Sequence, residues 1–292
     1  DSYHISKRTG KKIPYKGDVK VEKGKDAEFD CYAANQEMQY DAVRANRWHN
    51  YDLLKEAGDY KAQAELIVRS LKHFFDNDGV KDGVRIHESG DFYNGEYLRA
   101  WIEAARAMPD IKFYAYTKSI PFVKKFQEQI KDTPNLSITL SKGGKRDRDL
   151  ETTDFKESHV FNSPEEVLEA GLLLDLDDEL AKGTGGKDKN FALLVHGTQA
   201  KGEMSQTKRR NETFMAFWKY RDFLNRNLRL DSSHILSKDE ANDVLNRINN
   251  LDPSKHTKNL KFIKKLLNYV VKYHDYGFSN DLVNILQPKY RP

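Results

Sequence analysis

The stretch Val84-Arg-Ile-His-Glu-Ser-Gly90 decides the fold that this sequence predicts. It begins with apolar and polar residues in alternation, which is typical of a short strand. Two similar segments follow it, Ile111-Lys-Phe-Tyr-Ala-Tyr-Thr117 and Leu136-Ser-Ile-Thr-Leu-Ser141. The three segments begin roughly 25 residues apart, and successive parallel strands need a crossover of about a dozen residues or more between them. The spacing therefore favours a parallel sheet.

The residues between these strands have helical patterns. Asn94 is suited to cap a helix in which apolar residues recur every three or four positions. Trp101 and Ile102 lie on that apolar face, and we expect both to be buried between the helix and the sheet. Upstream, residues 39–55 and 61–75 are predicted to form two further helices, which Gly58 separates.

The alternation of strands and helices predicts an α/β protein. We expect a TIM-barrel-like fold or a partial parallel barrel, with a helical segment before it and a basic helical subdomain after it; an open parallel sheet fits the same pattern. The predicted domains are an irregular N-terminal segment or short hairpin at 1–30, the α/β domain at 31–205 and the basic helical subdomain at 206–292. Residues 158–162 and 191–196 supply two more strands, and the acidic and glycine-rich stretch 176–189 is predicted to be a loop.

Polar side chains gather where the predicted strands end. They are His87, Glu88 and Asp91 after the first strand, Tyr116, Thr117 and Lys118 on the second, Ser141 and Lys142 on the third, and His196 on the last. Sites in parallel α/β folds lie at the carboxyl ends of the strands, so we expect these side chains to face one mouth. Asp91 and Glu88 are the candidate catalytic residues. The candidate substrate-binding residues are His87, Tyr116, Thr117, Lys118, Lys142 and His196.

The two carboxylates have different predicted roles. Asp91 follows Gly90 and would stay ionised near Lys118 and Lys142, which suits a nucleophile or a cation ligand. Glu88 shares the apolar side of the strand with Ile86, so it is the candidate for a raised pKa and for acid–base work. The alternative is structural: Asp91 only closes the turn after the strand, and Glu88 pairs with a buried lysine.

Composition excludes several classes of protein. The 292 residues include 49 Lys and Arg and 45 Asp and Glu, which gives a formal net charge of +4. Cys31 is the single cysteine, so a disulfide framework, a four-cysteine zinc site and a three-cysteine iron–sulfur site are excluded. The sequence has no long apolar run, which excludes a membrane span. We expect neither a cofactor nor a bound metal.

The charge is unevenly distributed. Residues 206–292 hold 17 Lys and Arg against 9 Asp and Glu, and residues 253–274 contain six lysines and no acidic residue. Such a block suits a polyanion, because phosphate contacts supply most of the sequence-independent affinity for nucleic acids. The candidate nucleic-acid-binding residues are Arg209, Arg210, Lys258, Lys261 and Lys265. The alternative is a solvated helix face, opposite apolar residues at 260, 263, 267 and 270 that pack inward.

Several motifs together carry a resemblance to a known family. They are Cys31-Tyr-Ala33, Arg47-Trp-His-Asn50, the segment 85–92 with Glu96, Tyr97 and Trp101 after it, Phe113-Tyr-Ala-Tyr-Thr-Lys118, and Val195-His-Gly197. Over roughly residues 28–200 the chain resembles the bacteriophage family named after gene product eighty-eight of a mycobacteriophage. The resemblance implies a phage-derived protein located in the host cytoplasm. Members of that family carry further cysteines that this chain lacks, so no metal or iron–sulfur site is carried over.

A cysteine followed by a histidine on an α/β barrel is also similar, at the level of fold, to the guanine and deazaguanine transglycosylases. In those enzymes a strand-end aspartate attacks the sugar carbon, which implies a nucleophilic Asp91 with Glu88 as its acid–base partner. One hypothesis is therefore an enzyme that modifies nucleic acid or a nucleobase. The other is a non-catalytic phage protein on a decayed barrel that binds DNA or a host factor, for example an anti-defence protein.

Overall fold

A computed structural model describes residues 3–5, 12–14, 33, 36–37, 40–77, 83–183, 190–195, 211–212, 214–215, 223–230, 236–252 and 257–273. The chain divides into two compact units, one of Asp1–His159 with Asp178–Asn190 and one of Val160–Asp177 with Phe191–Pro292. The three-part division expected from the sequence stays a prediction.

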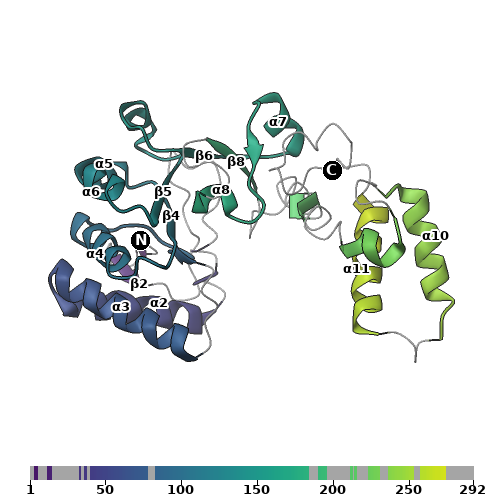
Figure 1. Ribbon diagram of the computed structural model, residues 1–292, viewed down its shortest axis with the longest axis horizontal. Coiled ribbons are helices and arrows are strands. Elements are labelled where there is room, and N and C mark those ends of the chain that lie inside the picture. Colours follow the sequence, from purple (N-terminus) through teal and green to yellow (C-terminus); the bar gives the residue numbers. More distant parts are fainter. Residues whose placement is uncertain are drawn as a thin grey trace. The chain divides into compact units, whose positions relative to one another are not determined.

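Six strands form one sheet (Figure 1). In spatial order they are β3 (Val84–Ile86), β4 (Phe113–Thr117), β5 (Leu136–Ser141), β6 (Glu157–Phe161), β8 (Phe191–Leu194) and β7 (Leu173–Leu174). The three strands that the sequence predicted are adjacent and parallel, as expected: Arg85 pairs with Tyr114, which in turn pairs with Ser137. The pairs β5–β6 and β7–β8 are parallel as well.

The sheet confirms the predicted α/β class, but it does not form the predicted barrel. Strands β3 and β7 stand at the two ends of the strand order, and no pairing between described strands closes the sheet. The predicted parallel α/β fold is confirmed, whereas the TIM-like or partial barrel is not found. Strand spacing could not decide this, because it indicates which strands are neighbours and contains nothing about tilt and stagger, which determine closure.

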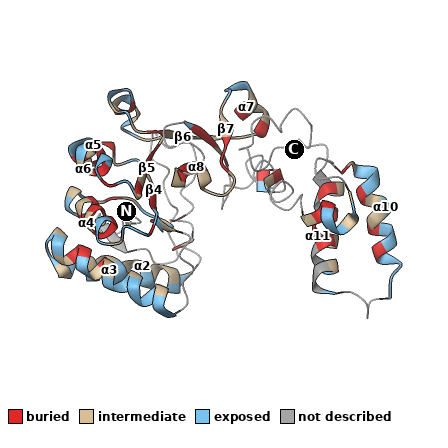
Figure 2. Cartoon of the chain, viewed as in Figure 1, coloured by how far each residue is buried: buried red, intermediate tan, exposed pale blue. Residues whose placement is uncertain are grey.

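One face of the sheet in the first unit is apolar and covered by helices. The helices on this face are α4 (Gly95–Arg106), α5 (Ile120–Lys125) and α6 (Gln127–Lys131). Helix α3 (Tyr60–Asn77) packs against α4, and α2 (Asp41–Ala57) packs against α3. Figure 2 shows buried residues on strands β4 and β5 and on helices α4, α5 and α6. As the sequence predicts, Asn94 caps α4: its Oδ1 accepts a hydrogen bond of 2.8 Å from the Tyr97 N–H.

Within α4, the two predicted core residues differ in burial. Ile102 is fully buried in the core that β4 and β5 share, as expected. Trp101 is only partly buried, so that prediction is wrong in degree. Its ring lies at the rim of the core, against the rings of Tyr97 and Phe113, with centroid distances of 6.4 and 6.3 Å. The centre of the apolar face of α4 passes through Leu98 and Ile102, one turn apart, and Trp101 lies beside that line.

The other face of the sheet in the first unit is polar. Its strand residues alternate with the core residues, and they are Arg85, Tyr114, Tyr116, Ser137 and Thr139. The short helix α8 (Glu179–Lys182) lies on this side of β4 and β5, opposite α4, α5 and α6 (Figure 1). The sequence predicted a loop here, because four helical residues are too few to show a 3.6-residue period.

The second unit contains α7 (Pro164–Glu169), the strands β7 and β8, and the helices α10 (Lys238–Asn249) and α11 (Lys258–Tyr273). Two predicted caps are confirmed: Ser163 accepts a hydrogen bond from the Glu166 N–H, and Ser237 forms a capping box with Glu240. Apart from the main sheet, β1 (Tyr3–Ile5) and β2 (Lys12–Pro14) pair as an antiparallel hairpin. The helix expected over 211–227 is described only in part, and the one expected after 279 lies outside the described residues.

Where the chain is described, no helix combines the length and the apolar character that crossing a membrane requires.

The burial of Ile102 gives a test of the core. We expect Ile102→Val to lower the free energy of unfolding by about 0.5–1.5 kcal/mol and Ile102→Ala by about 2–5 kcal/mol, because each step enlarges the cavity beneath the sheet. Urea denaturation followed by circular dichroism measures both. An alanine variant as stable as the parent would show that Ile102 does not lie in the core.

Candidate functional site

Asp91 joins the loops that follow β3 and β4. Its Oδ1 accepts hydrogen bonds from the Phe92 N–H at 2.7 Å and the Thr117 hydroxyl at 2.5 Å. Its Oδ2 accepts the Lys118 N–H at 2.8 Å. The Ser119 hydroxyl donates back to the Phe92 carbonyl at 2.8 Å, which ties the same two loops a second time. The aspartate therefore has the geometry of a clamp between two strand ends.

The electrostatics of Asp91 differ from the prediction. Burial raises the pKa of this carboxyl group above 3.8, and the hydrogen bonds from Thr117, Lys118 and Phe92 oppose that rise. The Lys118 ammonium, expected to keep Asp91 ionised, donates instead to the backbone at the end of β5: to the Ser141 carbonyl at 3.1 Å and the Lys142 carbonyl at 2.7 Å. The side chain of Lys142 is exposed.

His87 is partly buried and has an uncommon backbone conformation. Its φ of 66° is in the left-handed region, which is uncommon for residues other than glycine. Its ring packs against Phe92, with centroids 4.7 Å apart, and its Nε2 lies 3.1 Å from the Tyr97 hydroxyl. Burial lowers the pKa of His87 from 6.5 to about 4, so the ring is neutral at pH 7. The same burial raises the pKa of Tyr97 to about 12.

The turn at His87 also changes the position of Glu88. Strand β3 ends at Ile86, and the left-handed residue after it interrupts the alternation that would have placed Glu88 on the apolar side. The Glu88 side chain is 80% exposed and lies 3.6 Å from the Arg47 guanidinium. The environment proposed for an acid–base Glu88 is therefore absent, and its cationic neighbour is a partly exposed arginine rather than a buried lysine.

Arg47 connects two of the motifs that carry the family resemblance. Besides its ion pair with Glu88, its guanidinium donates to the Ala33 carbonyl at 2.9 Å and to Gln36 Oε1 at 2.7 Å. A chain of aromatic rings makes a second connection: Tyr51 on α2 packs edge-on against Tyr93, which stacks on Tyr97 at 4.6 Å. The motif residues therefore assemble the loop after β3 against α2.

A polar network on the far face of the sheet was missed by sequence reasoning. The Asp178 carboxylate accepts hydrogen bonds from Arg85 at 3.1 Å, Tyr114 at 3.0 Å and Tyr116 at 2.9 Å. The Arg85 guanidinium lies over the Tyr116 ring at 5.0 Å. Tyr116 was predicted as a substrate-binding residue, and here it contacts Asp178. The alternation of Arg85, Tyr114 and Tyr116 away from the core could have indicated a polar face; nothing in the sequence indicated Asp178.

Other predicted residues stay untested. His196, Arg209 and Arg210 lie outside the described residues, as does the side chain of Lys258. On α11, Lys261 and Lys265 are exposed. The inward packing predicted for the opposite face is confirmed, since Ile263, Leu267 and Val270 are buried there and Leu260 packs against the same cluster. No group of His, Cys, Asp and Glu side chains suited to a metal ion occurs among the residues that the structure describes.

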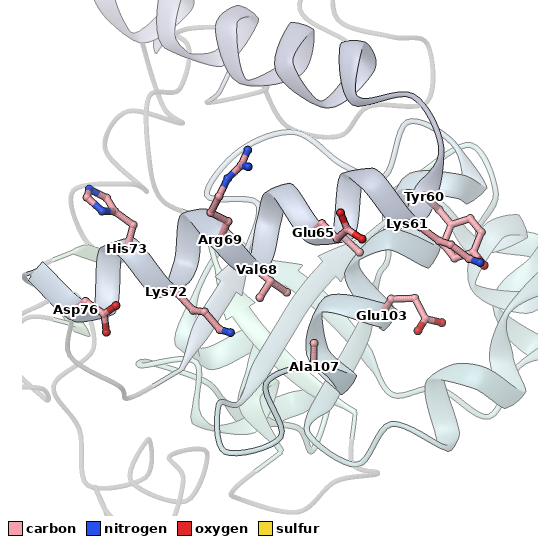
Figure 3. Close-up of a pocket in the computed structure, with 11 residues that line it drawn as sticks. Tyr60, Lys61, Glu65, Val68, Arg69, Lys72, His73, Asp76, Glu103 and Ala107 are labelled. Atoms are coloured by element: carbon pink, nitrogen blue, oxygen red, sulfur yellow. The ribbon is translucent and has the colours of Figure 1, made fainter.

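A groove of about 830 Å³ lies between α3 and α4, away from every predicted site residue (Figure 3). Its lining is largely charged and includes Lys61, Glu65, Lys72 and Glu103. The cations and the carboxylates are mixed, and Lys72 extends to the side of α3 on which Ala107 lies (Figure 3). This mixture favours no single class of ligand.

These features define a parallel α/β protein whose strand ends are tied together by a partly buried aspartate. The profile of the gene product 88 family matches residues 19–215, more than half of the chain. The chain therefore belongs to the gene product 88 family of bacteriophage proteins, as its motifs suggested.

Two curated relatives come from mycobacteriophages. The chain is 34% identical over 91 residues to the Gene 88 protein of Mycobacterium phage L5, and 33% identical over 91 residues to that of Mycobacterium phage D29. Each match covers 30% of this chain and 38% of the relative, so the chain spans well under half the length of these proteins. No solved structure matches the chain significantly, and the similarity to transglycosylases has no support from known structures.

If Asp91 clamps the two loops together, replacing it should lower the stability of the protein. Asparagine has one acceptor oxygen where the carboxylate has two, so at least one of the three donors loses its partner. We expect Asp91→Asn to lower the free energy of unfolding by about 1–3 kcal/mol. Thermal unfolding measures the change, and Asp132→Asn, at an exposed aspartate, is the control. If both variants melt with the parent, Asp91 is not a clamp.

The lowered pKa of His87 predicts that acid destabilises the protein. Its folded pKa of about 4 lies below its unfolded value of 6.5, so the unfolded chain binds more protons between these pH values. The contribution of His87 to the free energy of unfolding is therefore fully present above pH 6.5. It falls by about 3 kcal/mol as the pH is lowered to 4. The Asp91 carboxyl group, whose pKa is raised, acts in the opposite sense.

The comparison with His87→Asn isolates the histidine, since asparagine tolerates a positive φ and does not titrate. We expect the parent to lose about 3 kcal/mol more stability than this variant between pH 7 and pH 4. If the stabilities of the parent and of His87→Asn fell in parallel between pH 7 and pH 4, His87 would not be held neutral by the fold.

Proposed function

We propose that this phage protein binds nucleic acid through the exposed lysine face of α11 and that its α/β unit does not use Asp91 as a nucleophile. The observation that carries the proposal is the two-sided character of α11. Ile263, Leu267 and Val270 are buried on one side, and Lys261 and Lys265 are exposed on the other.

The chemistry of α11 suits a phosphate backbone. The helix contains five lysines and no aspartate or glutamate, so no acidic side chain of its own neutralises the lysine face. Lys261 and Lys265 are four residues apart, which places them on the same side of the helix, roughly 6 Å apart at their Cβ atoms. Lysines in such a row attract phosphates without reading the base sequence.

The state of Asp91 supports binding over catalysis. A nucleophilic carboxylate directs an oxygen lone pair at the substrate carbon, whereas three hydrogen bonds from the loops that Asp91 joins occupy most of the acceptor sites of its two oxygens. The Glu88 side chain is 80% exposed and pairs with Arg47, which does not give it the apolar environment that a general acid needs.

An enzyme acting on nucleobases is the second candidate, and one observation favours it. Asp91 has a raised pKa and His87 a lowered one, and both follow β3; perturbed pKa values are typical of active sites. Base exchange on DNA would distinguish the two. A soluble Asp91→Asn variant with the parent's melting temperature and no base exchange would favour the enzyme.

The binding experiment measures the affinity for a 30-base-pair duplex at several salt concentrations. We expect the parent to bind, and Lys261→Gln with Lys265→Gln to weaken binding and to reduce the salt slope by about 0.9 per lost phosphate contact. The control is Lys124→Gln with Lys131→Gln, which changes the net charge equally at exposed lysines of the first unit.

Equal losses in the two double variants would show that only net charge attracts DNA. A parent that does not bind duplex or single-stranded DNA at low salt would contradict the proposal outright.

A further inference from the structure

The Asp178 carboxylate fills a site that is built for an anion. Three donors from two strands converge on it: the Arg85 guanidinium and the Tyr114 hydroxyl reach Oδ2, and the Tyr116 hydroxyl reaches Oδ1. A guanidinium beside two hydroxyl donors is a typical arrangement for holding a carboxylate or a phosphate. Arg85 is 40% and Asp178 25% exposed in their side chains, so a small ligand in solution can reach them.

The segment that supplies Asp178 is a short strap, residues 178–183, which consists of Asp178, α8 and Gly183. It begins and ends with left-handed residues, at φ 63° for Asp178 and 81° for Gly183. This conformation is uncommon for residues other than glycine, although aspartate adopts it more readily than most. The hydrogen bonds to the Asp178 carboxylate help to maintain it.

Polar contacts hold the rest of the strap. The buried Lys156 ammonium donates to the Leu180 and Ala181 carbonyls at 2.6 and 2.8 Å, and the Ser137 hydroxyl donates to the Ala181 carbonyl at 2.6 Å. Leu180 and Ala181 are buried, yet they belong to neither of the two apolar clusters of the described residues. The polar contacts of the strap can be exchanged for those of another polar partner.

The same face of the sheet has hydroxyl groups without partners. Thr139 pairs in register with Tyr116, so the two side chains share this face. Thr139 and Ser158 are fully buried, and neither hydroxyl has a hydrogen-bond partner among the described residues. Buried hydroxyls of this kind are uncommon, and they point to a face that is suited to a polar ligand.

We propose that Arg85, Tyr114 and Tyr116 form a binding site for an oxyanion, a phosphate or a carboxylate, which Asp178 occupies in the closed state. An incoming oxyanion displaces the Asp178 carboxylate and takes over the same three donors, and the strap at 178–183 then releases. The site belongs to the first unit, and it is independent of nucleic-acid binding by α11.

The experiment measures the binding of inorganic phosphate and, separately, of acetate by isothermal titration calorimetry at pH 7. We expect Asp178→Ala to bind one of these anions at least tenfold more tightly than the parent, because the internal competitor is removed. Adding Arg85→Gln to this variant should abolish the gain. Comparing the two anions shows which oxyanion the site prefers.

Glu179→Ala is the matched control, since it removes one negative charge from the residue next to Asp178. The Glu179 carboxylate pairs with Lys182 and not with Arg85. It should bind the anions as the parent does. An equal gain in Glu179→Ala, or none in Asp178→Ala, would overturn the proposal. Asp178→Asn repeats the comparison with an acceptor oxygen retained; if neither Asp178 variant folds, Asp178 is a structural link only and the proposal fails.

Discussion

The hydrogen bonds to the Asp91 carboxylate are the interaction on which the candidate site depends. They join the end of β3 to the end of β4 through Phe92, Thr117 and Lys118. Once this edge is fixed, His87 can be held in its left-handed conformation against Phe92 and Tyr97, and Glu88 is turned outward to Arg47. A residue that resembles a nucleophile in the sequence therefore organises the strand ends.

The two faces of the sheet have different roles in this account. The apolar face packs against α4 and α5 and supplies stability, whereas the polar face presents Arg85, Tyr114 and Tyr116 to the strap that contains Asp178. In the second unit, helix α11 also has one apolar and one polar side: its apolar side is buried, and Lys261 and Lys265 are exposed. Recognition of anions is the chemistry that we propose for both surfaces.

The sequence predicted the strands from 84 to 141, their parallel order and the caps at Asn94, Ser163 and Ser237, because these depend on local patterns. Sheet closure depends on contacts between distant strands, so the barrel could not be decided. At the site, strand alternation failed at His87, because β3 ends at Ile86 and His87 has a positive φ. Asp178 was missed because its partner Arg85 is 93 residues away.

Hydrogen exchange at the backbone amides of Phe92 and Lys118 tests the central claim most directly. If the Asp91 carboxylate clamps the two loops, both amides should exchange as slowly as that of Ala115, which lies inside β4. In Asp91→Asn, at least one of the two should exchange faster while Ala115 keeps its protection. Amides of Phe92 and Lys118 that exchange in the parent as fast as unstructured peptide would contradict the account.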